Sequence, residues 1–288
     1  MTGAAATAAS GPGGPPVRGG TLAAWSRRLV AFGPPAVVFV AVLVGWELIV
    51  GALALKAFIL PQPSVILAAL GDNWDAGARF ALSTSAAATL LEAAGGLLIG
   101  TVVGVVVAFI STRWATARGV LLPVAVAAGA VPIIAFAPLF NNWFGVLNPL
   151  SKAMMAAVLV FFPVMANVIR GLVQVPPASL ELMRSYAASD WTILRKVRIP
   201  NALPYFFTAL KLGATLSLIG AVVGEYFGGA SFVLGRIVVQ SASALRYDVT
   251  WAAIFLMAGT GIVLYLLISF VERLAIPWHG ALRGPEDR

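Results

Sequence analysis

Long apolar stretches separated by short polar loops constrain the fold of this chain more than any other feature. A membrane-spanning helix needs about 20 mainly apolar residues. Six stretches approach or reach that length, at about 35–55, 84–110, 119–136, 151–168, 205–227 and 249–271. Hydrophobic residues make up 60% of the sequence and charged residues only 10%, whereas an average soluble domain has about 25% charged residues. The sequence therefore predicts an all-α, polytopic membrane protein with six transmembrane helices.

The predicted spans divide the chain into a tail, a membrane domain and a second tail. Residues 1–20 are mostly Ala, Gly, Pro and Thr and lack the apolar core of a signal peptide. We therefore predict a disordered cytosolic tail at residues 1–30, a transmembrane domain at 31–275 and a cytosolic C-terminal tail at 276–288. In the second span, Gly96, Gly100 and Gly104 recur every fourth residue, which predicts a helix face for close packing.

The distribution of basic residues predicts the orientation in the membrane. Six spans place both termini on one side, and cytosolic loops carry an excess of Lys and Arg. With cytosolic termini, thirteen basic residues lie in the cytosol, five lie outside and Lys211 lies in a span, which accounts for all 19. We predict a multi-pass protein of the cell membrane (inner or plasma membrane) with both termini cytoplasmic, and this asymmetry explains the net charge of +8 without nucleic acid binding. The outside residues are Lys56, Arg79, Lys152, Arg236 and Arg246.

The longest polar run between two spans covers residues 181–204. Pro177 and Ser179 are typical of a helix start, and Pro200 with Pro204 of a helix stop, so we predict a short amphipathic helix at about 177–198. Small side chains at its centre would let another surface approach closely. Such a helix suits docking to a cytosolic partner, or lying on the lipid surface. The small residues are Ala187, Ala188 and Ser189.

This run resembles the cytoplasmic coupling loop, or EAA loop, of ATP-binding-cassette (ABC) importer permeases. The pattern of that loop is E-A-A, three residues, G, nine residues and I-x-L-P. In this sequence Glu181 takes the position of the glutamate and Ala187 that of the glycine. Val197 takes the position of the isoleucine, and Ile199-Pro200 stands for the final L-P, while Leu182-Met183 replaces the two alanines.

Further stretches are similar to one branch of these permeases, which serves sulfonates, taurine, nitrate and pyrimidine thiamine precursors. The similarity covers about residues 46–279, and the ending at 272–279 is more similar to the pyrimidine-precursor members. The similar stretches are Trp46-Glu47-Leu48 with Leu60-Pro61-Gln62-Pro63-Ser64; Pro132 with Ala137-Pro138-Leu139, Trp143-Phe144-Gly145, Ser151-Lys152 and Phe162-Pro163; and Val223-Gly224-Glu225.

The resemblance implies a permease subunit of the ABC importer permease (MetI-like) fold that moves a small polar solute into the cytoplasm, such as a pyrimidine thiamine precursor or a sulfonate. Its implied partners are an ABC ATPase subunit, an extracytoplasmic solute-binding protein, a second permease copy in a homodimer and the lipid membrane. A separate ATPase agrees with the sequence, which has no G-x-x-x-x-G-K-[ST] motif for ATP phosphates. The residues expected to couple to the ATPase are Glu181, Arg184, Ala187, Ala188, Ser189, Asp190, Arg195, Lys196 and Pro200.

Polar residues at membrane depth are candidates for the solute path, because an ionisable group there is costly and usually functional. The spans contain Glu47, Glu92 and Glu225. We interpret Glu225 as part of an aromatic-lined vestibule, since glycines without side chains make its helix narrow there and Tyr226-Phe227 follows. The alternatives are that these carboxylates reach the interface or pair with another helix, and that residues 141–144 form an interfacial aromatic belt. The residues predicted for the path are Glu225, Asn141, Asn142 and Phe144.

The residue types exclude several other chemistries. The chain has no cysteine, and its single histidine is His279, so disulfides, thiolate metal sites and multi-histidine metal sites within one chain are excluded. We expect no cofactor, and no pairing of a nucleophile with a base indicates an enzyme. Two other classes stay open: an ion-coupled secondary transporter or channel without an ATPase, and a scaffold that anchors a cytosolic enzyme through the polar loop.

Overall fold

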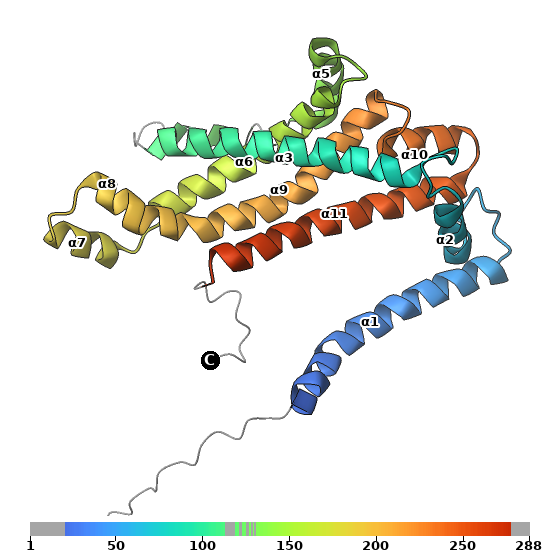
Figure 1. The fold of residues 1–288 in the computed structure, drawn as a ribbon, viewed down its shortest axis with the longest axis horizontal. Helices are drawn as coiled ribbons and strands as arrows, with labels where there is room; N and C mark the ends of the chain where they lie inside the picture. Colours follow the sequence, from blue (N-terminus) through green and yellow to red (C-terminus); the bar gives the residue numbers. More distant parts are fainter. Residues whose placement is uncertain are drawn as a thin grey trace, which may run out of the picture. The chain divides into compact units, whose positions relative to one another are not determined.

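The computed structural model describes residues 21–112, 119–120, 123–124, 127, 129 and 131–277, with side chains from residue 34 onward except at residue 36. Within these residues every regular element is a helix (Figure 1), which confirms the all-α prediction. The chain divides into two units, Met1–Ala54 and Leu55–Arg288, and each is described by itself.

The first unit contains one long helix, α1 (Thr21–Ala52). This helix covers residues 21–30 of the stretch predicted as a disordered tail at residues 1–30; residues 1–20 lie outside the described residues, so the tail stays a prediction there. The apolar part of α1, Val37–Ala52, falls within the first predicted span. Its large apolar side chains, such as Phe39 and Leu48, are exposed within the unit, as expected for a helix that faces lipid.

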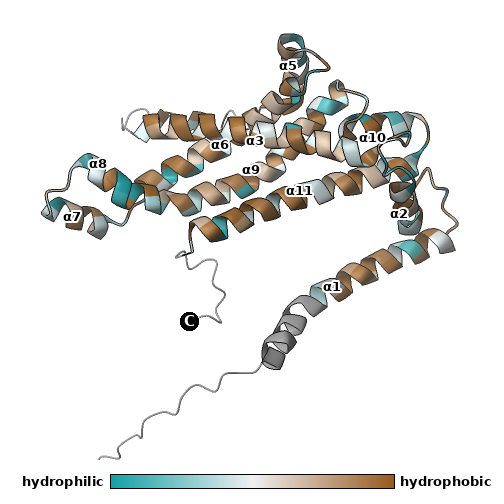
Figure 2. Cartoon of the chain, viewed as in Figure 1, coloured by the Kyte–Doolittle hydropathy of each residue, from teal (hydrophilic) through white to brown (hydrophobic). Residues whose placement is uncertain are grey.

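The second unit is a bundle of long apolar helices. α3 (Leu82–Thr112), α6 (Pro149–Val173) and α11 (Tyr247–Ala275) are long and apolar enough to cross a membrane, and so is the continuous helix Asp190–Phe227. Hydrophobic residues cover most of the length of these four helices (Figure 2). The four helices contain the spans predicted at 84–110, 151–168, 205–227 and 249–271.

The span predicted at 119–136 is described only in part. Its last residues form a short 3-10 helix, η1 (Ile133–Phe136). Residues 121–122, 125–126, 128 and 130 lie outside the described residues, so the continuity of this span stays a prediction.

Short helices lie at the two ends of the bundle and at its edge. We call the end with α7 and α8 the loop end, and the end with α2 and α10 the α10 end (Figure 1). The helix α5 follows η1 and precedes α6. The bounds are α2 (Pro63–Asp72), α5 (Ala137–Phe144), α7 (Pro177–Ser185), α8 (Asp190–Ile193), the π-helix η2 (Leu194–Arg198), α9 (Ile199–Phe227) and α10 (Leu234–Ser243).

The helix α6 is central because small residues let α3 and α9 approach it from two sides. A Cβ added at Gly96 of α3 would lie 2.6 Å from the carbonyl oxygen of Ala153 on α6. On α9, a Cβ added at Gly220 would lie 2.6 Å from the Cα of Ala156. Both distances are shorter than van der Waals contact, so only glycine fits at these two positions. The glycine face predicted for α3 therefore packs directly on α6.

A salt bridge joins α9 to α11 inside the bundle. Lys211 Nζ lies 2.8 Å from Glu272 Oε2, and the Glu272 side chain is buried. Opposite charges that pair in this way make ionisable residues tolerable within a span.

Candidate functional site

The segment between α6 and α9 consists of two helices joined by a turn. The single helix predicted at about 177–198 is wrong in this respect, because α7 ends at Ser185 and α8 begins at Asp190. The start predicted at Pro177 is confirmed. Ser189 caps the second helix: its side chain accepts a hydrogen bond from the backbone N–H of Thr192 at 3.4 Å, which satisfies a free donor of the first turn.

Ala187 causes the break between the two helices. Its φ is 51°, in the left-handed region that an L residue with a Cβ adopts only at a cost. The backbone N–H of Ala187 donates to Arg184 O at 2.9 Å, and that of Ala188 donates to Met183 O at 3.0 Å, which closes the end of α7. Glycine adopts this conformation readily, so the geometry explains why the loop pattern has glycine where this chain has Ala187.

The chain remains helical from Asp190 to Phe227, so the helix stop predicted at Pro200 and Pro204 is wrong. Pro200 directly follows the π-helical turn η2, and Pro204 lies inside α9; each proline removes one backbone donor, which kinks a helix but does not always end it. Immediately before Pro200, the backbone N–H of Ile199 bonds to Leu194 O five residues earlier. This π-helical turn shifts the hydrogen-bond register at the entry to α9.

Large apolar side chains are exposed at the loop end. Leu182 is 56% exposed, Tyr186 75% and Trp191 67%. The small residues of this loop were predicted from the sequence as the contact point, whereas these three were not. A signal was available, because large apolar residues in an otherwise polar loop indicate contact with a partner or with lipid.

The predicted coupling residues gather around this exposed apolar group. Arg184, Arg195 and Lys196 carry exposed positive charges, and Asp190 is exposed in the first turn of α8. Two hollows flank the segment: one of about 330 Å³ contains Arg184 and Asp190, and one of about 410 Å³ contains Lys196. Of the remaining predicted residues, Glu181, Ala187 and Ser189 are exposed, and Ala188 and Pro200 are half-buried.

Asn201 fastens the segment to the bundle. Its side-chain Nδ2 donates to the carbonyl oxygens of Gly171 at 2.7 Å and Gln174 at 3.1 Å. At Gly171, α6 also packs closely on α9, since a Cβ added there would lie 2.7 Å from Ala202 Cα. The end of α6 and the start of α9 are thus held together directly behind α7 and α8.

The α10 end contains a buried cluster of ionisable residues from three helices: Glu92 of α3, Lys152 of α6 and Glu225 of α9. Their side chains are 7%, 1% and 0% exposed, respectively. Lys152 Nζ donates to Asn141 Oδ1 at 3.4 Å and to the carbonyl oxygen of Val146. No group of three or more His, Cys, Asp or Glu side chains in the described part of the chain could hold a metal ion.

The same cluster holds the start of α10. The backbone N–H of Gly235 donates to Glu225 Oε2 at 2.6 Å, and that of Leu234 donates to Thr89 Oγ1 at 3.0 Å. These two side chains satisfy free donors of the first turn of α10. A carboxylate of α9 and a hydroxyl of α3 therefore fix α10 to the bundle.

The structure brings together only part of the predicted path set. Asn141 is buried and joined to Lys152, and its Nδ2 would lie 3.1 Å from a Cβ added at Gly228, just after the end of α9. Asn142 is exposed, and Phe144 packs on Phe140 within α5 with ring centroids 6.1 Å apart. The carboxylate of Glu225 is fully enclosed in this conformation, so its contact with a solute stays a prediction.

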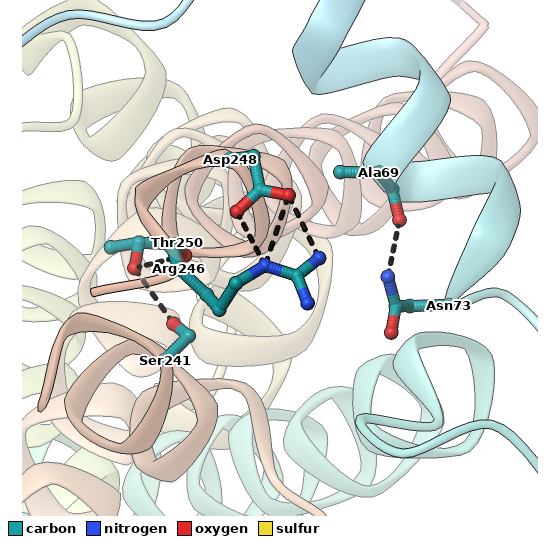
Figure 3. Close-up of polar contacts among 6 residues, drawn as sticks. All are labelled: Ala69, Asn73, Ser241, Arg246, Asp248 and Thr250. Atoms are coloured by element: carbon teal, nitrogen blue, oxygen red, sulfur yellow. Dashed lines mark hydrogen bonds and ion pairs between the residues drawn. The ribbon is translucent and has the colours of Figure 1, made fainter. Parts of the chain in front are cut away.

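Polar contacts also organise the turn between α10 and α11 (Figure 3). Arg246 Nη2 lies 2.8 Å from Asp248 Oδ2, and the hydroxyls of Ser241 and Thr250 are 2.7 Å apart. The hydrogen bonds to Asp248 raise the pKa of the Arg246 guanidinium above its ordinary value, so this exposed residue stays a cation. In α2, the Asn73 side chain donates to Ala69 O at 2.8 Å and closes that helix.

An apolar cavity of about 620 Å³ lies beside the middle of α6. Phe136 of η1 and Phe162 of α6 contribute aromatic rings to its wall, and Leu216 contributes from α9. These residues could not be predicted for the path from the sequence, because an apolar residue in a span has the same pattern in a cavity wall as in a packed core.

The bundle of spanning helices, with an exposed loop at one end, matches a known class of transport proteins. The chain belongs to the family described as "Binding-protein-dependent transport system inner membrane component", which residues 96–277 match. It is a multi-pass membrane protein and a transport subunit of the ABC importer permease type, as the resemblance of its loop predicts. The alternatives of a secondary transporter, a channel or a scaffold are not supported.

Similar proteins of named function agree with this family. The chain is 31% identical to a probable ABC transporter permease protein of Haemophilus influenzae, over 78% of this chain and 89% of the relative. It is 30% identical to the riboflavin transport system permease protein RibX of Chloroflexus aurantiacus, over 87% and 91%. It is 28% identical to the formylaminopyrimidine transport permease protein ThiX of Halalkalibacterium halodurans, over 85% and 95%.

Proposed function

We propose that this permease works with a separate ABC ATPase that docks on the loop end, and with a solute-binding protein that delivers the solute at the α10 end. Two copies of the chain form the pathway, since one loop segment engages one ATPase subunit. Both termini and the loop end lie in the cytosol. ATP binding closes the ATPase pair, and the continuous helix Asp190–Phe227 carries that movement into the bundle as near-rigid motion.

The observation that carries this proposal is the exposed apolar group of Leu182, Tyr186 and Trp191 among positive charges. Aromatic anchors contribute most of the affinity in protein interfaces, whereas rim charges contribute mainly to register and association rate. Asn201 supports the segment from behind, through its bonds to the end of α6. A movement of the ATPase bound at Trp191 would therefore displace α6 and α9 together.

Two exposed tryptophans allow a matched test of docking. Trp191 at the loop end is 67% exposed and Trp143 on α5 is 65% exposed. Trp191→Ala should reduce copurification of the ATPase by about tenfold or more, the loss typical of an interface anchor, while Trp143→Ala should leave it unchanged. The measurement is the ratio of ATPase to permease after purification in lipid nanodiscs. Equal ratios for the two variants would show that the loop end is not the ATPase site.

These alanine variants test docking more directly than a bulky substitution at Ala187 would. Because Ala187 has a positive φ, a change to tryptophan there would mix backbone strain with lost docking. Trp191 lies in the first turn of α8, where alanine keeps the helix.

The proposed orientation has an independent test, since the chain contains no cysteine. Single cysteines at positions 10, 189 and 231 are labelled with a membrane-impermeant thiol reagent in intact cells. Only Ser231→Cys, between α9 and α10, should react from outside. Labelling of Ser189→Cys from outside would contradict both the orientation and the docking site.

The solute is proposed to be a small polar molecule with a planar ring, of the pyrimidine-precursor kind. The support is the aromatic and apolar wall of the cavity beside α6 and the similarity to a riboflavin and a formylaminopyrimidine transport permease. The described wall of this cavity carries no cation, whereas a sulfonate or nitrate would be attracted by one. Purifying the partner binding protein and identifying its bound molecule by mass spectrometry tests this; a sulfonate would contradict it.

A further inference from the structure

The cluster at the α10 end contains two carboxylate oxygens without a hydrogen-bond partner. Glu92 is 7% exposed and Glu225 is 0% exposed, and their carboxyl groups lie within hydrogen-bonding range of each other. Nevertheless Glu92 Oε2 and Glu225 Oε1 have no partner. An ionised carboxylate only accepts hydrogen bonds, so two ionised groups placed in this way cannot bond to each other and repel.

The charges of the cluster do not balance when all its members are ionised. Lys152 is the cation that acts on both carboxylates, so two negative charges face one positive charge. α5 contributes Asn141 and no charged side chain. Arg236 of α10 is half-buried and is not among the groups that act on either carboxylate. A buried charge without compensation is strongly unfavourable, and a single proton would remove both the excess charge and the unpaired oxygens.

We propose that Glu92 and Glu225 form a proton-binding site, in which the protonated carboxyl of Glu92 donates a hydrogen bond to the ionised carboxylate of Glu225. The hydrogen bonds identify which residue is ionised. Glu225 accepts from the Gly235 N–H at 2.6 Å and interacts with the Thr89 hydroxyl, and such donors favour a carboxylate. Glu92 Oε2 accepts none, which favours the neutral acid.

This proton joins α3 to α9 at the point where both hold the start of α10. Glu225 binds the Gly235 N–H, and Thr89, one turn before Glu92 on α3, binds the Leu234 N–H. Loss of the proton would leave two negative charges beside Lys152 and would push α3 and α9 apart. Since the folded state then binds a proton that the unfolded chain releases, stability falls as the pH rises.

Infrared spectroscopy tests for the proton directly. The purified full-length permease in lipid nanodiscs at neutral pH should show a C=O band of a protonated carboxylic acid that shifts in D₂O. Glu92→Gln should abolish this band. Glu272→Gln is the matched control, because Glu272 is also buried but forms a salt bridge with Lys211, and it should leave the band unchanged. A band that survives Glu92→Gln, or no band in the wild type, overturns the proposal.

Thermal unfolding across pH provides a second test that needs neither the ATPase nor the solute. The wild-type midpoint should fall between neutral and alkaline pH. Glu92→Gln keeps a neutral N–H donor for Glu225, so its midpoint should match the wild type at neutral pH and stay constant at alkaline pH. Glu92→Ala removes the donor and should lower the midpoint already at neutral pH.

Two results would overturn the assignment. If Glu92→Gln is as damaging as Glu92→Ala, Glu92 acts as an ionised carboxylate. If the midpoint rises with sodium chloride but not with choline chloride, and no acid band is present, a sodium ion occupies the site in place of the proton.

Discussion

The two ends of the bundle place charged residues in opposite environments, exposed at the loop end and buried at the α10 end. At the loop end, Arg184, Arg195 and Lys196 project into the surroundings beside an exposed Trp191. At the α10 end, the carboxylate of Glu225 and the ammonium group of Lys152 are enclosed and bound to backbone or side-chain groups. The charges at the loop end are exposed, whereas those at the α10 end hold the helices of the bundle together.

The two ends should therefore differ in what they contribute to stability and to docking. Exposed charges contribute little to folding, because water already solvates them. A buried charge must be compensated, and removing its partner is strongly destabilising. Substitutions at the loop end should therefore alter docking and leave the fold intact, while substitutions at the α10 end should affect the fold itself.

The largest effect on stability is expected when a lysine is replaced by methionine at one end and, in a second variant, at the other end. Lys152→Met removes the cation that compensates the buried carboxylates, so we expect a loss of about 3–5 kcal/mol in stability. Lys196→Met removes an exposed cation and should change stability by about 0.5 kcal/mol or less. The measurement is the thermal unfolding of both variants in the same detergent at neutral pH. Similar losses of stability in the two variants would contradict the difference between a buried charge at the α10 end and an exposed charge at the loop end.

A smaller effect is expected where the helices that connect the two ends pack together. Gly96→Ala places a Cβ 2.6 Å from Ala153 O, and such overpacking costs about 1–3 kcal/mol. Gly259 of α11 is the control, since a Cβ there meets nothing within 4 Å. Comparing the yield and the unfolding midpoint of Gly96→Ala and Gly259→Ala isolates the contact with α6. An unaffected Gly96→Ala variant would mean that α3 and α6 are farther apart in the membrane.

The smallest effect is expected at the turn of the loop end. Ala187→Gly should relieve the positive φ and stabilise the turn by about 1 kcal/mol or less, with transport retained. Ala187→Val should weaken the turn, because a β-branched residue fits this conformation poorly. Hydrogen exchange of residues 177–198 reports both changes. Faster exchange in Ala187→Gly would show that the segment is a single helix in the membrane.

The sequence could predict features that depend on neighbouring residues. Hydropathy located the four spans that the described residues contain, and the spacing of Gly96, Gly100 and Gly104 located the packing face of α3. The motif around Glu181 identified the family. The sequence could not show that the helix from Asp190 to Phe227 continues through Pro200, because a proline can begin, kink or end a helix.

The membrane class, the polar helical segment between α6 and α9 and the small-residue contacts could thus be predicted from the sequence, because all three depend on local composition and spacing. Only the tertiary structure decided the roles of the charged residues. Lys152 counts as an outside residue in the chain's charge pattern, yet it is buried beside Asn141. Glu92 and Glu225 are far apart in the sequence and meet because α3 and α9 both pack on α6. Burial depends on which helices surround a residue, and residues distant in the chain supply those helices.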